Sequence, residues 1–336
     1  MSTATAPAPA GRARADLLAR DEVLFALAVL VSYLVSAVWA REFSLPGPIL
    51  IWFPPAGVAI VALYLRPRLL PLIVVAGVFS TAVIMDLGDE FGVGPLLVNS
   101  IVIPGAYAVA AWVMRQWRSD LTLRAAEDVI VLLVGTAVGS LLAAVAGVLV
   151  QVWTELLEWS DFGKEVGIFW IGDVVGAVCL APALLLAARA YLRHEPLPIS
   201  DHDTPGPWYL LAVEYLTPAV LAVVVMEVGQ APMRFTYLAF IPVAFIAVRH
   251  GIPGAALSTG ALCAVMTAGA QAQVAETLDR SDFQLQLLVL SITGVMLGAV
   301  SAPGTELRAG CSRSARSWRH HRSWWRPSTG TATSGT

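Results

Sequence analysis

One acidic residue stands alone in a strongly apolar part of the chain. Asp173 lies in the stretch FWIGDVVG, residues 169–176, where every neighbour is apolar or glycine. An ionisable side chain near the centre of a membrane costs roughly 2.5 to 3.5 kcal/mol on insertion scales, so it usually faces a cavity or a partner. Such an acid can sense a ligand, lock two helices together or help to move ions. A proton relay, however, usually needs a chain of acids or histidines across the membrane.

Small residues flank this acid on the same predicted helix. Gly172 and Gly176 have the G-x-x-x-G spacing that lets a second helix approach closely. Pro182 follows Asp173 after two and a half turns and is expected to kink the helix. At 1.5 Å per residue, Asp173 lies roughly 12 Å from the outer end of its span, which places it in the outer half of the membrane.

The stretch WFPPAG, residues 52–57, begins another span in the same outer half. Pro54 and Pro55 donate no backbone hydrogen bonds and suit the first turn of a helix. Together with Gly57 they predict a rigid, closely packed start to this helix.

Asn99, in LLVNSIVIPG, lies early in the next inward-running span, where a buried amide needs hydrogen-bond partners. A structural bond between helices and a place in an outward-facing pocket are both open to it. Trp170 belongs with Trp153 and Trp159 to the aromatic residues typical of a membrane interface. The candidate residues for ligand binding or helix locking are therefore Asp173, Gly172, Gly176, Trp170, Asn99, Pro54, Pro55 and Gly57.

The elements that position these residues are predicted to be membrane helices. Of 336 residues, 57% are hydrophobic and 13% are charged, and the mean hydropathy is +0.72. A soluble domain carries about 25% charged residues. The composition indicates an all-α, polytopic integral membrane bundle, and we expect no nucleic-acid partner because no basic face exists outside the loops and the tail.

Ten apolar runs are long enough, or nearly so, to span a membrane. The count falls to eight if two runs are re-entrant or merged. The eighth and ninth are separated only by the turn Arg249-His250-Gly251. The runs are 23–40, 49–65, 69–86, 95–114, 127–152, 165–190, 209–228, 235–249, 252–272 and 283–302.

The basic residues predict the orientation of the chain. With the N-terminus in the cytoplasm and alternating spans, 17 of the 21 lysine and arginine residues fall on the cytoplasmic side. Cytoplasmic loops are enriched in such residues. We therefore expect both termini in the cytoplasm.

Motifs for catalysis, metal or cofactor binding are not found. There is no P-loop, H-E-x-x-H, hydrolase serine elbow or dinucleotide fingerprint. Cys179, Cys263 and Cys311 are far apart in the sequence, and two of them lie in apolar runs, as small hydrophobic residues do. We expect no enzyme activity, no cofactor and no metal site.

The chain divides into a cytoplasmic N-terminal tail (1–22), a membrane domain (23–302) and a Ser-, Arg- and Trp-rich tail (303–336). This last tail has no periodicity and no apolar core. It is either a flexible tail, a basic anchor on anionic lipid, or the product of a shifted reading frame that replaces a longer output domain.

Three stretches resemble the bacterial membrane-associated sensor domain MASE1. They are WFPPAGVAIVALYLRPRLLP, FWIGDVVGAVCLAPALLL and YLAFIPVAFIAVRHGIPGAALSTG, and the resemblance covers about residues 23–302. Pro182, Arg249 and Gly251 belong to these signature stretches. In similar proteins a Glu follows the fourth-span Asn by about three residues, whereas Val102 occupies that position here.

The resemblance implies a sensory input module in the inner (plasma) membrane of a bacterial cell. Such a module feeds a histidine kinase, a diguanylate cyclase or a phosphodiesterase. No such output domain follows residue 302 in this sequence. The expected partners are the lipid bilayer, a transporter or cytoplasmic signalling protein, and a second copy of the chain. Two other functions stay open: a small-solute or ion transporter, and a structural partner in a membrane complex.

Overall fold

A computed structural model describes residues 10–42, 52–84, 92–118, 120–123, 126–197, 236–273 and 280–301, with positions 212, 213, 216, 217, 220 and 224. These residues form helices and their connections, and no strand occurs among them. The all-α prediction is confirmed. The helices are α1 (Ala10–Glu42), α2 (Pro54–Leu65), η1 (Pro67–Leu69), α3 (Leu70–Ile84), α4 (Val93–Trp117), α5 (Ala126–Trp153), α6 (Phe162–Arg193), η2 (Thr236–Ala239), α8 (Phe240–Gln273) and α9 (Arg280–Ser301).

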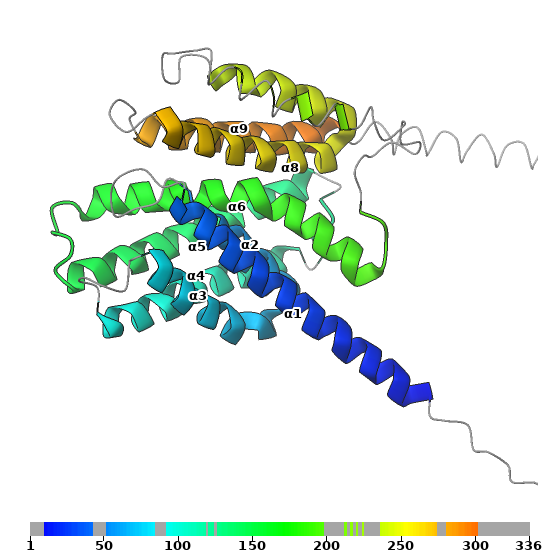
Figure 1. Cartoon of the computed structure of the whole chain (residues 1–336), viewed down its shortest axis with the longest axis horizontal. Helices are drawn as coiled ribbons and strands as arrows, with labels where there is room; N and C mark the ends of the chain where they lie inside the picture. The colour runs from blue at the N-terminus through cyan, green and yellow to red at the C-terminus, as the bar shows by residue number, and fades with distance from the viewer. Residues whose placement is uncertain are drawn as a thin grey trace, which may run out of the picture.

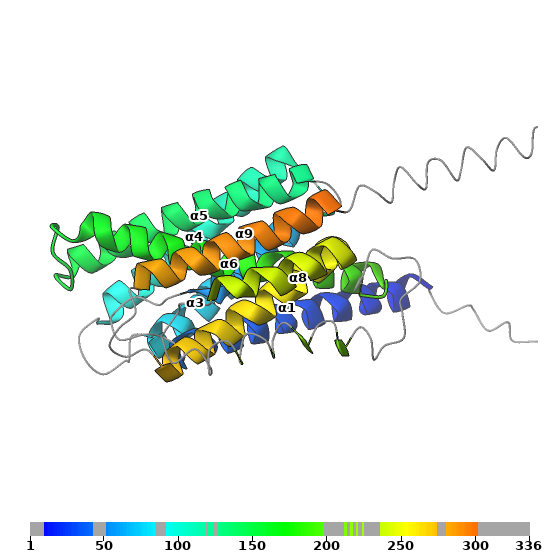
Figure 2. The ribbon, with the colours of Figure 1, turned by 90° about the horizontal axis from the view of Figure 1, so that it is seen from above.

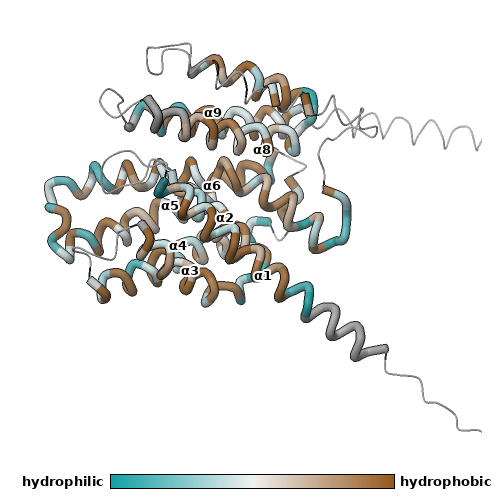
Figure 3. Tube along the Cα trace, in the orientation of Figure 1, coloured by the Kyte–Doolittle hydropathy of each residue, from teal (hydrophilic) through white to brown (hydrophobic). Residues whose placement is uncertain are grey.

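Hydrophobic residues run along these helices, and hydrophilic residues gather at the two ends of the bundle (Figure 3). Six helices in the described ranges are long and apolar enough to cross a membrane: Arg20–Glu42, Val93–Trp117, Ala126–Trp153, Phe162–Arg193, Tyr237–Ala268 and Asp282–Ser301. Pro54–Leu65 and Pro67–Val83 are shorter apolar helices. The predicted count of ten spans therefore stays a prediction, and most of the run 209–228 lies outside the described residues.

Helix α2 lies at the centre of the bundle. Its residues from Pro54 to Tyr64 are all buried, because α1, α4 and α6 pack around it. With 12 residues it is about 18 Å long, well short of the roughly 30 Å of hydrocarbon that a spanning helix crosses. Its neighbours can therefore cover both its sides and its ends.

The chain reverses inside α8. Gly251 has φ 67° and ψ −152°, a conformation that is essentially restricted to glycine. The two parts of α8 are thus separate helices that fold back on each other, as Figures 1 and 2 show. This reversal lies at the turn that the sequence predicts.

The beginning of α1 and the end of α9 lie at the same end of the bundle (Figures 1 and 2). Between them, α6 contacts α2 and α5 on one side and α8 and α9 on the other. Helix α6 is therefore the element through which the first helices meet the last ones. The predicted domain boundaries stay predictions, and the tail 303–336 lies outside the described residues.

Candidate functional site

Asp173 lies inside the protein on α6 and is only 1% exposed. Tyr107, from α4, is fully buried and donates a hydrogen bond from its hydroxyl to Asp173 Oδ2 at 2.5 Å. Tyr33, from α1, is also buried and interacts electrostatically with both Asp173 and Tyr107. Three helices thus place two phenols around one carboxyl group.

A carboxyl group buried in this way depends on its hydrogen-bond donors, because bulk water does not reach it. The ion pairs among the described residues lie elsewhere, and none of them includes Asp173. The Tyr107 hydroxyl is therefore the polar partner that the structure gives this acid.

Helix α2 approaches α6 at the two glycines beside Asp173. The backbone N–H of Phe53 donates to the Gly172 carbonyl oxygen at 3.1 Å. A Cβ on Gly176 would lie 2.3 Å from the carbonyl carbon and oxygen of Phe53. A Cβ on Gly57 would lie 3.2 Å from Gly176 O. Glycine, whose side chain is a single hydrogen atom, allows the two backbones to lie this close together.

Pro54 and Pro55 occupy the first turn of α2, where their missing N–H groups cost no helical hydrogen bond. Both are buried, and Ala56 N–H completes the turn by donating to Phe53 O at 3.1 Å. The structure therefore brings the diproline start of α2 next to the Asp173 stretch.

Asn99 is buried on α4, but the α4 residue that reaches Asp173 is Tyr107, about 12 Å further along the helix. The Asn99 Oδ1 atom has no hydrogen-bond partner among the described residues. Trp170 is 36% exposed and donates from Nε1 to the Ala137 carbonyl of α5 at 2.9 Å. Neither residue is thus placed in contact with the carboxyl group.

The signature residues lie farther along the chain. Pro182 is buried inside α6, which continues past it to Arg193. Arg249 is exposed at the reversal of α8, and Gly251 O lies against Gly298 of α9, whose added Cβ would be 2.9 Å away. Pro182 and Gly251 therefore lie in the packing between helices, away from Asp173.

Helix α9 is attached to α6 at two points. Gln284 Nε2 donates to Ile168 O at 3.3 Å. Two turns further along α9, Ser291 Oγ lies 2.9 Å from Cys179 Sγ, and Cys263 of α8 brings its sulfur within 2.9 Å of Cys179 as well. One buried cluster thus joins α6, α8 and α9.

Sequence reasoning missed Tyr33, Tyr107 and the contact of the two cysteines. Aromatic residues and cysteines in apolar runs usually belong to the core, so their types alone do not mark a site. The available signal for the tyrosines was the acid itself, since a buried carboxyl group requires a donor from a neighbouring helix.

The described residues contain no group of three or more His, Cys, Asp or Glu side chains arranged to hold a metal ion. The Asp173 site is instead a carboxyl–phenol cluster between helices. Its chemistry is hydrogen bonding between side chains of α4 and α6.

The model of the MASE1 family matches residues 23–306 of this chain. No curated protein and no solved structure matches the chain. MASE1 is a family of membrane-associated sensor domains. Since the match covers most of the chain, the protein belongs to the MASE1 family.

Proposed function

We propose that the chain is a sensory input module in the plasma membrane of a bacterial cell. It serves a histidine kinase or a cyclic-di-GMP system and acts on a cytoplasmic output domain or a separate signalling partner. The observation that carries this proposal is the buried hydrogen bond between Tyr107 and Asp173, on a helix that also contacts α9.

The stimulus acts on the outer half of the bundle, where a ligand or a partner transporter engages the region near Asp173. A stimulus shifts a protein between two states only if it binds one of them better. The Tyr107–Asp173 bond is suited to such a difference, because it is a buried link between side chains of α4 and α6 that one state can keep and the other can lose.

The signal leaves through α9. Movement of α6 reaches α9 through the Gln284–Ile168 hydrogen bond and the contact between Ser291 and Cys179. Glycines at 294 and 298 let α9 pack closely against α8, where added Cβ atoms would lie 2.6 Å from Thr259 and 2.7 Å from Ala255. A displacement of α9 is then carried to the cytoplasmic side.

A chimera of residues 1–302 with a diguanylate cyclase domain tests this function. Asp173→Leu and Tyr107→Phe are expected to change cyclase activity in the same direction, because each removes one partner of the same hydrogen bond. Arg115→Gln, an exposed residue near the end of α4, is the matched control and is expected to leave it unchanged.

Flux measurements on the full chain in proteoliposomes separate sensing from transport. The sensor function predicts no proton, sodium or potassium uptake above that of empty liposomes. Uptake that Asp173→Asn abolishes and Arg115→Gln preserves identifies a transporter and overturns the proposal.

A further inference from the structure

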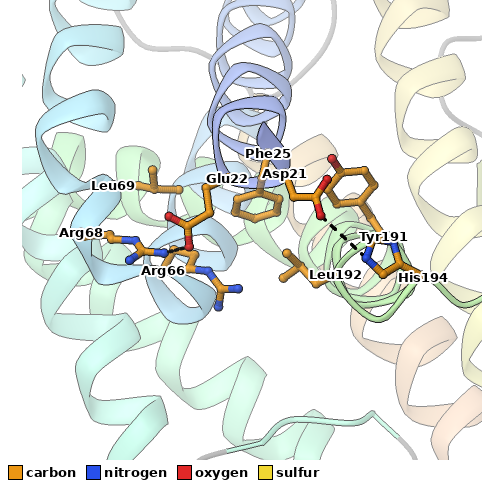
Figure 4. Close-up of a pocket in the computed structure, with 9 residues that line it drawn as sticks. All are labelled: Asp21, Glu22, Phe25, Arg66, Arg68, Leu69, Tyr191, Leu192 and His194. Atoms are coloured by element: carbon orange, nitrogen blue, oxygen red, sulfur yellow. Dashed lines mark hydrogen bonds and ion pairs between the residues drawn. The ribbon is translucent and has the colours of Figure 1, made fainter. Parts of the chain in front are cut away.

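A polar pocket of about 120 Å³ lies where α1, the α2–α3 turn and the end of α6 meet (Figure 4). It is remote from Asp173 and no part of the sensory proposal uses it. Its lining combines charged and aromatic side chains from residues far apart in the sequence: Asp21, Glu22, Phe25, Arg66, Arg68, Leu69, Tyr191, Leu192 and His194.

The pocket holds two arginines and two acids, and a histidine lies beside one of the acids. Arg68 pairs with Glu22, and His194 Nε2 lies 3.8 Å from Asp21 Oδ2. Arg66 donates from Nη1 to the carbonyl oxygen of the adjacent Leu65 at 3.2 Å. No described acid forms an ion pair with Arg66, so its guanidinium group is free to bind an anion that enters the pocket.

An apolar groove of about 420 Å³ adjoins the polar pocket, and Phe25 and Tyr191 line both. On α1 the groove extends from Leu24 to Ser32, which corresponds to about 12 Å along the helix axis. Its walls are otherwise aliphatic and come from α2 and from residues 184–191 of α6. A pocket that holds an arginine without an ion-pair partner among the described residues therefore opens into an elongated apolar groove.

We propose that this composite site binds one anionic phospholipid, with its phosphate at Arg66 and an acyl chain in the groove. The polar pocket adjoins one end of the apolar groove, just as the headgroup of a lipid adjoins its acyl chains. Basic pockets between membrane helices bind anionic headgroups, and each buried CH₂ group contributes about 0.8 kcal/mol. Arginine also suits phosphate geometry, because its guanidinium forms paired hydrogen bonds with phosphate oxygens.

The test is the melting temperature of the purified full chain in detergent, titrated with dioleoyl-phosphatidylglycerol or dioleoyl-phosphatidylcholine. Phosphatidylglycerol is expected to raise the melting temperature more, and native mass spectrometry is expected to retain one molecule. Arg66→Gln should weaken phosphatidylglycerol binding about fivefold. Arg115→Gln, an exposed arginine outside the pocket, should not.

A second variant tests the groove. Ala28 is exposed and lines it, so Ala28→Phe fills the groove without entering the core. This variant is expected to lose stabilisation by both lipids while it stays monodisperse in gel filtration. Glycerol 3-phosphate, which has the anionic group without chains, is expected to stabilise the native chain far less than phosphatidylglycerol.

Three results would overturn the proposal. The first is equal stabilisation by the two lipids. The second is full stabilisation by glycerol 3-phosphate, which would make the site one for a soluble anion. The third is an Ala28→Phe variant that binds lipid normally but changes oligomeric state, which would make the groove an interface between two copies of the chain.

Discussion

Tyr107 of α4 and Asp173 of α6 are 66 residues apart in the sequence and share one buried hydrogen bond of 2.5 Å. The bond crosses between two helices, and α2 is wedged against the same part of α6 through Phe53 and Gly172. Loss of the bond would leave a buried acceptor without this donor, which costs free energy because the acceptor is shielded from bulk water.

A double-mutant cycle measures this bond. Tyr107→Phe and Asp173→Leu are each expected to lower the free energy of unfolding, by about 1–3 kcal/mol for a buried polar group that loses its partner. The double variant should cost less than the sum, with a coupling energy of about 1 kcal/mol. Unfolding in mixed detergent micelles provides the measurement, and a coupling energy of zero would show that the two side chains do not interact.

The α2–α6 contact predicts opposite changes in stability when two glycines of α6 are replaced by alanine. In Gly176→Ala, the added Cβ would meet the Phe53 and Pro54 backbone at 2.3–2.7 Å, so the helices must separate. We expect a loss of about 1–3 kcal/mol. Gly167→Ala is the matched control, because nothing lies within 4 Å of its added Cβ and alanine favours helix. Equal melting temperatures for the two variants would contradict this packing.

The reversal of α8 depends on the backbone of Gly251. Alanine at this position must adopt φ 67° and ψ −152°, at a cost of about 1–3 kcal/mol. Gly105→Ala on α4 is the control, since Gly105 has open space around it and an ordinary φ. Thermal unfolding should separate the two variants; a Gly251→Ala protein as stable as the control would mean that the chain does not turn here in this way.

The contact of Cys179 with Cys263 predicts a specific crosslink between α6 and α8. In a Cys311→Ser background, the membrane-permeable oxidant diamide should join the two thiols while it is itself reduced to a hydrazine. Both cysteines then lose their reactivity to maleimide after denaturation in SDS, and a reducing agent restores it. A Cys263→Ser variant should keep Cys179 reactive throughout. Two reactive thiols after oxidation would place the sulfurs farther apart than 2.9 Å.

The close approach of helices at FWIGDVVG shows which features of the packing a sequence pattern predicts. The spacing of Gly172 and Gly176 predicts that a helix can pack there, and the structure supplies α2 as that helix. The glycine spacing does not specify which helix packs there, because small residues are compatible with many helices. The reversal at Gly251 was more readily predicted, since a polar Arg-His pair before Gly interrupts two apolar runs.

Asn99 and Tyr107 show where residue type misleads. Asn99 is the more polar residue and therefore the stronger candidate from the sequence, yet Tyr107 is the donor that reaches Asp173. Which residue of α4 faces α6 depends on the rotation and depth of that helix. Those follow from packing against α3 and α5, which a single sequence does not specify.

Hydrogen exchange of the α9 amides tests the central claim most directly, because the proposed signal passes from Asp173 on α6 to α9. Asp173→Asn in the full chain is expected to change exchange protection in residues 282–301 and to leave α3 unchanged, since α3 contacts α1 and α4 but not α6 among the principal helix pairs. Arg115→Gln should change neither. Unchanged protection in α9, or an equal change in α3 and α9, would contradict a signalling connection between Asp173 and the last helix.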